Sequence, residues 1–155
     1  MFFKKDSFLS TEQKARIVNT IREAELQTSG EIRIHIESSC PAKEPINRAI
    51  EVFNKQKMYD TKDKNGILIY IAHGDRKFAI YGDKGIHAQV PENYWSDTLA
   101  VLADYFKREQ YEEGLRVVAL QIGDKLKQLF PYAANDKNEL PNEIKRLRAW
   151  GPFCG

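Results

Sequence analysis

The longest apolar stretch of the chain, residues 67–72, reads Ile-Leu-Ile-Tyr-Ile-Ala and contains no charged residue. A strand exposed to water on one face alternates apolar with polar side chains, whereas a strand covered on both faces is apolar throughout. The stretch is also far shorter than the roughly 20 residues that a membrane-spanning helix needs. It therefore predicts a central strand with a layer of structure packed against each side.

Two further strands are expected next to this central strand. Residues 32–37 alternate isoleucine with a polar residue, which predicts a strand with one apolar face. The turn-forming sequence His-Gly-Asp-Arg at residues 73–76 follows the central strand, so residues 77–82 are expected to return as the second strand of a hairpin.

Four helices are expected around these strands. Ser10 and Gln13 have the spacing of a helix capping box, and apolar residues then recur at helical spacing until Gly30, which is expected to end this helix. Residues 46–57 predict a second amphipathic helix. Pro91 is expected to open a third helix, and the fourth is expected to end before Pro131.

The order of these elements, α-β-α-β-β-α-α, predicts an α/β fold. Because the central strand is apolar on both faces, helices must cover the sheet from both sides. The expected architecture is a three-layer α/β/α sandwich with a small mixed sheet. The strand-helix-strand unit over residues 32–72 makes its two strands parallel, and the hairpin makes the third antiparallel.

Composition excludes several classes of protein. The 155 residues carry a formal net charge of +2, with 24 basic and 22 acidic side chains, so the basic surplus of a nucleic-acid-binding protein is absent. The first residues, Met-Phe-Phe-Lys-Lys-Asp, do not have the pattern of a secretory signal, and no membrane span is expected. A cytoplasmic location is therefore expected.

Cys40 and Cys154 form no Cys-x-x-Cys pair, so the sequence indicates neither a zinc site nor a disulfide.

The expected topology brings acidic loops to one edge of the sheet. Glu31 precedes the first strand, the Asn65-Gly66 corner precedes the central strand, and Asp83 follows the hairpin strand. The loop before the central strand adds Asp60 and Asp63. Carboxylates that lie close together repel one another, and a divalent cation relieves this repulsion. Oxygen ligands alone indicate Ca²⁺ or Mg²⁺ rather than zinc.

The same residues have a second interpretation, in which they bind nothing. Aspartate and asparagine are ordinary turn residues at the ends of strands, and Glu31 follows a glycine that itself favours a turn. His35, on the less apolar face of its strand, also has two interpretations. It is either a base or a hydrogen-bonded sheet or interface residue. The pattern of residues leaves both alternatives open.

Three segments together resemble the TPM domain family, also called the TPM phosphatase domain. They are Thr-Ser-Gly-Glu-Ile-Arg-Ile at 28–34, Asn-Gly-Ile-Leu-Ile-Tyr-Ile at 65–71 and Ile-Tyr-Gly-Asp-Lys-Gly-Ile at 80–86. A Tyr-x-x-Gly-Leu step at 111–115 agrees as well, and residues 136–140 are similar to the short, soluble bacterial form. The similarity indicates a TPM domain over residues 8–144 and a C-terminal tail over 145–155, whose Trp150–Gly155 run is given no function.

The resemblance implies an acidic pocket that holds divalent cations. Residue by residue, it implies metal ligands at four acidic positions, of which the last two match only the short bacterial form: Glu31, Asp83, Asp136 and Glu139. Asn65 and Gly66 match the family's turn before the central strand, where glycine permits a sharp bend. Asp60 and Asp63 are expected to line the same loop.

Two functions follow from this interpretation. The first is a domain that binds Ca²⁺ or Mg²⁺ and has at most weak phosphomonoesterase activity, because some relatives, including a plant thylakoid-lumen protein, are described as acid phosphatases. The second is a non-catalytic module for protein interaction or assembly, in which the metal orders a loop. The sequence assigns no catalytic residue, which favours the second function slightly. Divalent cations and a protein are the expected partners, and nucleic acid is not.

Overall fold

The computed structural model describes residues 8–132, and their three strands form one mixed sheet in the order β1-β2-β3. Strand β1 (Glu31–Glu37) pairs in parallel with β2 (Gly66–Ala72), and β2 pairs antiparallel with β3 (Lys77–Gly82). The register sets Glu31 opposite Gly66 and Ile67 opposite Gly82. Both predicted strand pairings are therefore confirmed.

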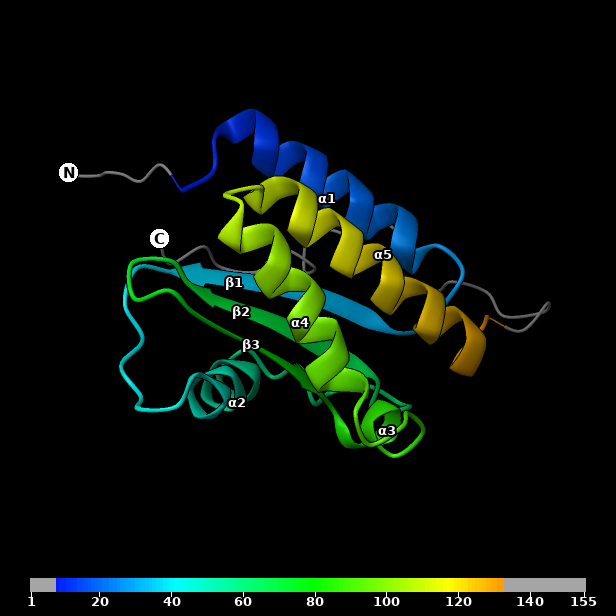
Figure 1. The fold of residues 1–155 in the computed structure, drawn as a ribbon. Helices are drawn as coiled ribbons and strands as arrows, with labels where there is room; N and C mark the ends of the chain where they lie inside the picture. Colours follow the sequence, from blue (N-terminus) through cyan, green and yellow to red (C-terminus); the bar gives the residue numbers. More distant parts are fainter. Residues whose placement is uncertain (1–7, 133–155) are drawn as a thin grey trace.

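Helices lie on both faces of this sheet (Figure 1). Helices α1 (Thr11–Glu25), α4 (Tyr94–Lys107) and α5 (Tyr111–Leu129) cover one face, and α2 (Pro45–Lys55) lies against the other. The predicted α/β fold with a small mixed sheet is confirmed. None of the helices in residues 8–132 is both long enough and apolar enough to cross a membrane.

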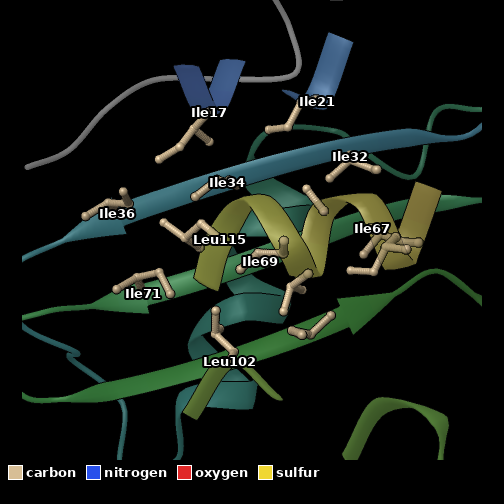
Figure 2. Close-up of a cluster of buried hydrophobic side chains, with 14 of the residues drawn as sticks. Ile17, Ile21, Ile32, Ile34, Ile36, Ile67, Ile69, Ile71, Leu102 and Leu115 are labelled. Carbon is tan, nitrogen blue, oxygen red and sulfur yellow. The ribbon is translucent and has the colours of Figure 1, made fainter. Parts of the chain in front are cut away.

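The main core lies between the sheet and the three-helix layer. Every second residue of β1 and of β2 points to this face, and each of these residues is an isoleucine. All of them are buried against side chains of α1, α4 and α5 (Figure 2). Burial of a large aliphatic side chain contributes about 2 kcal/mol, so this face supplies much of the driving force for folding. The alternation that the sequence shows over 32–37 places these isoleucines on one side of β1.

The second core lies between the sheet and α2, and it contains polar groups. Its apolar part brings Val52 and Phe53 of α2 against Leu68 and Tyr70 of β2. The alternate residues of β1 on this face are Arg33, His35 and Glu37, and all three are buried. The sequence predicted an apolar face for β1 but did not show that the polar face is buried too.

The helices differ from the prediction in four places, of which the smallest is α2, expected over 46–57 and observed over Pro45–Lys55. The capping box at Ser10 and Gln13 is present, but α1 ends at Glu25, before Gly30. Instead, Gly30 lets the chain pass close to α5, because a Cβ atom at this position would lie 2.7 Å from a side-chain carbon of Leu126. Helix α4 begins at Tyr94, after a turn at Pro91. A short helix that the sequence did not predict, α3 (Lys84–His87), follows β3.

Candidate functional site

Glu31 and Asp83 lie on the same edge of the sheet, one on each side of β2. Glu31 is paired with Gly66 in the parallel register, and the Asp83 backbone N–H donates to the Gly66 carbonyl over 2.9 Å. Figure 1 shows the start of β1, the start of β2 and the end of β3 together, next to α3. Strand pairing thus brings together two acidic residues that are 52 positions apart in the chain.

Both carboxylates at this edge are buried. Glu31 is 5% exposed and Asp83 is 6% exposed. The Glu31 carboxylate lies 3.8 Å from the guanidinium of Arg33, two residues along the same strand. Asp83 Oδ1 accepts a hydrogen bond of 2.8 Å from the Lys84 backbone N–H and so caps α3, whereas Asp83 Oδ2 is buried and has no hydrogen-bond donor among residues 8–132.

The loop before β2 is tied to this edge through Ser29. The Ser29 hydroxyl donates to Asp63 Oδ2 over 3.2 Å and accepts from the Asn65 amide nitrogen over 3.0 Å. The backbone carbonyl of Asn65 in turn accepts a hydrogen bond from the Glu31 backbone N–H, at 3.4 Å. Asn65 is buried, whereas Asp63 is exposed. Asp63 therefore reaches the site from the solvent side.

Gly66 and Gly85 let the loop before β2 pack closely against its neighbours. Gly66 does so through its lack of a side chain and not through the sharp bend that was expected there. The positive φ values between α2 and β2 belong to Lys57, at 56°, and Lys64, at 51°, and not to Gly66. A Cβ atom at Gly66 would approach the Met58 carbonyl oxygen to 3.1 Å, and one at Gly85 would approach the Asp63 carbonyl oxygen to 2.0 Å. Gly85, which the sequence analysis did not assign to the site, thus lets α3 pack directly on the loop.

Of the remaining predicted residues, Asp60 is not brought to this edge. Asp60 is exposed, and its backbone N–H donates to the Lys57 carbonyl within its own turn. Asp136 and Glu139 lie outside the described residues. Ser29 is a contact that the sequence analysis missed, although it stands inside the Thr-Ser-Gly-Glu segment that was singled out.

The donors at this edge suit a hard cation, but they do not form a complete set of ligands. Side-chain oxygens of Glu31, Asp63 and Asp83 are the chemistry that Ca²⁺ and Mg²⁺ prefer. Within residues 8–132, however, no three carboxylate, histidine or cysteine side chains are arranged to hold a metal ion together. The buried Asp83 Oδ2 is the atom that fits a cation ligand best.

A second group of buried polar residues lies on the α2 face, at the other end of β1. The Glu37 carboxylate accepts two hydrogen bonds from the Arg48 guanidinium, at 2.8 and 2.9 Å, and a third from the Tyr70 hydroxyl. Burial alone raises the pKa of the Glu37 carboxyl, but the hydrogen bonds from Arg48 and Tyr70 outweigh it and bring that pKa to about 2. Burial and the bond to Glu37 raise the pKa of Tyr70.

His35 extends this group along the strand. Its Nε2 lies 3.4 Å from a Glu37 oxygen, and its Nδ1 lies 3.4 Å from the side-chain nitrogen of Gln56. The side-chain oxygen of Gln56 accepts a hydrogen bond from Arg33. Burial lowers the pKa of His35 despite the neighbouring carboxylate, which favours the neutral ring. His35 is therefore a hydrogen-bonded interface residue, which is one of its two interpretations from the sequence.

Comparison with known proteins identifies the family. The family model described as the TPM domain matches residues 3–125, which is most of the chain. The chain belongs to the TPM domain family. The resemblance drawn from the three sequence segments is confirmed, and the two carboxylates at the sheet edge belong to segments of this TPM domain that carried the resemblance.

Two solved structures are similar to this TPM domain. The BA42 protein from the psychrophilic bacterium Bizionia argentinensis is 41% identical, with a TM-score of 0.80, over 90% of this chain and 95% of that one. The N-terminal domain of the cg2496 protein from Corynebacterium glutamicum is 11% identical, with a TM-score of 0.57, over 91% and 97% of the two chains, and shows a shared fold alone. No curated protein matches the chain.

Proposed function

We propose that this TPM domain binds a divalent cation, Ca²⁺ or Mg²⁺, at the sheet edge between Glu31 and Asp83. The observation that supports this most strongly is Asp83 Oδ2, a buried oxygen with no hydrogen-bond donor among residues 8–132. A buried oxygen without a hydrogen-bond partner carries a desolvation cost. A bound cation supplies the missing partner, and the second buried carboxylate across Gly66 adds a further oxygen.

The number of protein ligands bears on the choice of ion. Mg²⁺ is commonly held by one or two carboxylates and keeps several of its waters, whereas Ca²⁺ takes about six to eight oxygens. Glu31 and Asp83 match the number of carboxylates that Mg²⁺ commonly takes from a protein, with waters or a phosphate group completing its six ligands. Binding of Ca²⁺ requires more ligands, for which Asp63 and the two predicted residues outside the described part, Asp136 and Glu139, are the candidates.

Any phosphomonoesterase activity is proposed to be weak. A cation at this edge supplies a Lewis acid that polarises a phosphoryl oxygen. The chain's own groups offer little beyond that, because the recorded side-chain partners of the Ser29 hydroxyl are a carboxylate and an amide rather than the histidine that commonly activates a serine. Efficient hydrolysis would require a nucleophile or base that is positioned against the phosphorus atom.

The alternative function is a non-catalytic interaction module. It is supported by the loop before β2, where the exposed Asp63 reaches the site through a single side-chain bond to Ser29. A cation shared between Asp63 and the buried carboxylates would order this loop and so prepare a surface for a protein partner. Cation binding is common to both functions, so it is the property to test first.

The test is a titration of the full chain with Ca²⁺ and with Mg²⁺, followed by amide chemical shifts and by calorimetry. Amides near Glu31, Asp63 and Asp83 are expected to shift, and Glu31→Gln and Asp83→Asn are each expected to weaken binding by at least about tenfold. Both substitutions keep the size of the side chain, and the asparagine of the second variant keeps an oxygen that can cap α3. The matched control is Glu113→Gln, an exposed acid in the first turn of α5.

Unchanged affinity in both variants would exclude these carboxylates from the cation site. Hydrolysis of p-nitrophenyl phosphate is measured on the same samples. Turnover that depends on Mg²⁺ and disappears in both variants would assign catalysis to this edge. Equal turnover in the wild type and in both variants would instead indicate a contaminating enzyme. Cation binding without turnover supports the interaction module.

A further inference from the structure

A cavity of about 580 Å³ lies at the opposite end of the sheet from Glu31 and Asp83. It is bounded by the turn between β2 and β3, by the junction of α4 with α5, and by Phe8 just before α1. Figure 1 shows these three segments together at the end of the sheet where the strand β2 finishes. The volume lies within the range of about 300–1,000 Å³ that is typical of small-molecule sites.

The apolar wall of the cavity is aromatic. Phe8, Phe78, Phe106 and Tyr111 all line it and are half-buried, so each ring has a part that neighbouring side chains leave uncovered. The rings contact one another in sequence, with centroids 5.3 Å apart for Phe78 and Phe106, 5.1 Å for Phe106 and Tyr111, and 4.9 Å for Phe8 and Tyr111. Such a group of rings offers stacking and edge contacts to a planar apolar ligand.

The charged side chains that line the cavity are mostly basic. Arg76, Lys77 and Lys107 line it together with a single acid, Glu109. Lys77 donates to the Lys43 carbonyl, but Arg76 and Lys107 are exposed, and no acidic side chain among residues 8–132 pairs with either. The remaining polar residue, His73, is stacked on Phe8 with centroids 4.9 Å apart.

We propose that this cavity binds a small planar aromatic anion, with its ring against the Phe78–Phe106–Tyr111 wall and its acidic group toward Arg76 and Lys107. The apolar wall supplies the contact area, and the two exposed cations supply the selectivity for a negative charge. A neutral ligand of the same shape would keep the ring contacts and lose the charge interaction. This site is independent of the cation site, because the two lie at opposite ends of the sheet.

The test uses 2-naphthoate as the probe and its neutral amide, 2-naphthamide, as the matched control ligand. Each is titrated into the full chain up to about 10 mM, which covers the weak binding expected for a ligand of this size. Naphthoate is expected to shift the amides of residues 73–78 and 103–111 in a saturable manner, and to bind at least about threefold more tightly than naphthamide.

Three substitutions and one control connect the binding to the cavity. Arg76→Gln and Lys107→Gln are each expected to weaken naphthoate binding by about threefold and to leave naphthamide binding unchanged, whereas Lys127→Gln, an exposed lysine in the last turn of α5, changes neither. Ala103→Phe places a ring inside the cavity and is expected to abolish binding of both ligands. The amide spectrum of each variant without ligand shows whether it is folded.

Four results would overturn the proposal. They are the absence of saturable shifts in the wild type, shifts that lie away from residues 73–78 and 103–111, equal affinity for the acid and the amide, and unchanged binding in a folded Ala103→Phe variant. Each of these results is independent of whether Ca²⁺ or Mg²⁺ binds near Glu31.

Discussion

A buried carboxylate lies near each end of β1, Glu37 at one end and Asp83 at the other, and the two carboxylates differ in how many hydrogen bonds they accept. At the end of the strand, Glu37 accepts hydrogen bonds from Arg48 and Tyr70 and is enclosed by groups of the protein itself. At its start, Glu31 lies 3.8 Å from Arg33, and the neighbouring Asp83 keeps one buried oxygen without a donor among residues 8–132.

This difference separates a structural carboxylate from a candidate ligand. Removing one partner from a buried charge whose hydrogen bonds are complete within the chain is strongly destabilising, and such a carboxylate has no oxygen available for an ion. A buried carboxylate oxygen without a donor adds a cost that an external cation can remove. Burial alone therefore does not mark a functional acid, and the inventory of hydrogen bonds decides between the two roles.

The largest effect is expected from Glu37→Gln. The substitution removes the charge that Arg48 and Tyr70 surround, so it is expected to lower the free energy of unfolding by about 3 kcal/mol in urea denaturation. The control is Glu51→Gln, because Glu51 also bonds to Arg48, at 2.9 Å, but its side chain is 61% exposed, and a change below about 0.5 kcal/mol is expected. Similar losses in the two variants would contradict the structural role given to Glu37.

A slightly smaller change in the free energy of unfolding is expected when the pH is lowered. Because the pKa of Glu37 is about 2 in the folded protein and near 4.5 in the unfolded chain, its contribution is complete above pH 4.5 and is lost as the pH falls toward 2. The lowered pKa of His35 acts in the same direction, since below pH 6.5 the unfolded chain takes up a proton more readily than the folded one.

Urea denaturation at a series of pH values measures this dependence. The difference in unfolding free energy between the wild type and Glu37→Gln is expected to shrink by up to about 3 kcal/mol between pH 5 and pH 2. A difference that stays constant over this interval would show that the ionisation of Glu37 is not coupled to folding.

The smallest effect on stability is expected from Asp83→Asn, and it sharpens the comparison most. Without added cation, removal of this charge is expected to change the free energy of unfolding by less than about 1 kcal/mol, because one oxygen has no donor within residues 8–132 to lose and the cap of α3 is kept. With added Mg²⁺, the wild type is expected to gain more stability than the variant, which binds the cation more weakly. A large loss without cation would place Asp83 with Glu37 as a structural residue.

The sheet and its helices could be predicted because their signals are local. Alternation over 32–37, the apolar run over 67–72 and the turn at 73–76 specify the strand pairs, and the pairs carry Glu31 and Asp83 to one edge. The end of α1 and the presence of α3 could not be predicted in the same way. Gly30 serves contact with Leu126, which is distant in sequence, and Gly85 of α3 serves contact with the Asp63 backbone, which is also distant in sequence.

The details of the candidate sites were less accessible from the sequence. Ser29 and Gly85 contribute contacts to a loop about 20 to 35 residues away, so no spacing pattern indicates them. Asp60 looked equivalent to Asp63 in the sequence, yet only Asp63 is bonded to the edge, through Ser29. The aromatic wall of the cavity is built from four separate segments, which only their packing unites.

The sequence by itself determined which faces of the strands are apolar, how the strands pair and that Glu31 and Asp83 reach one edge, because side-chain periodicity and chain connectivity dictate these features. Only the tertiary structure decided which buried carboxylate is neutralised by the protein and which keeps an oxygen without a donor in the described part of the chain. The physical reason is that desolvation and hydrogen bonding depend on neighbours in space, and residues such as Arg48 and Tyr70 meet Glu37 only after the helix has packed on the sheet.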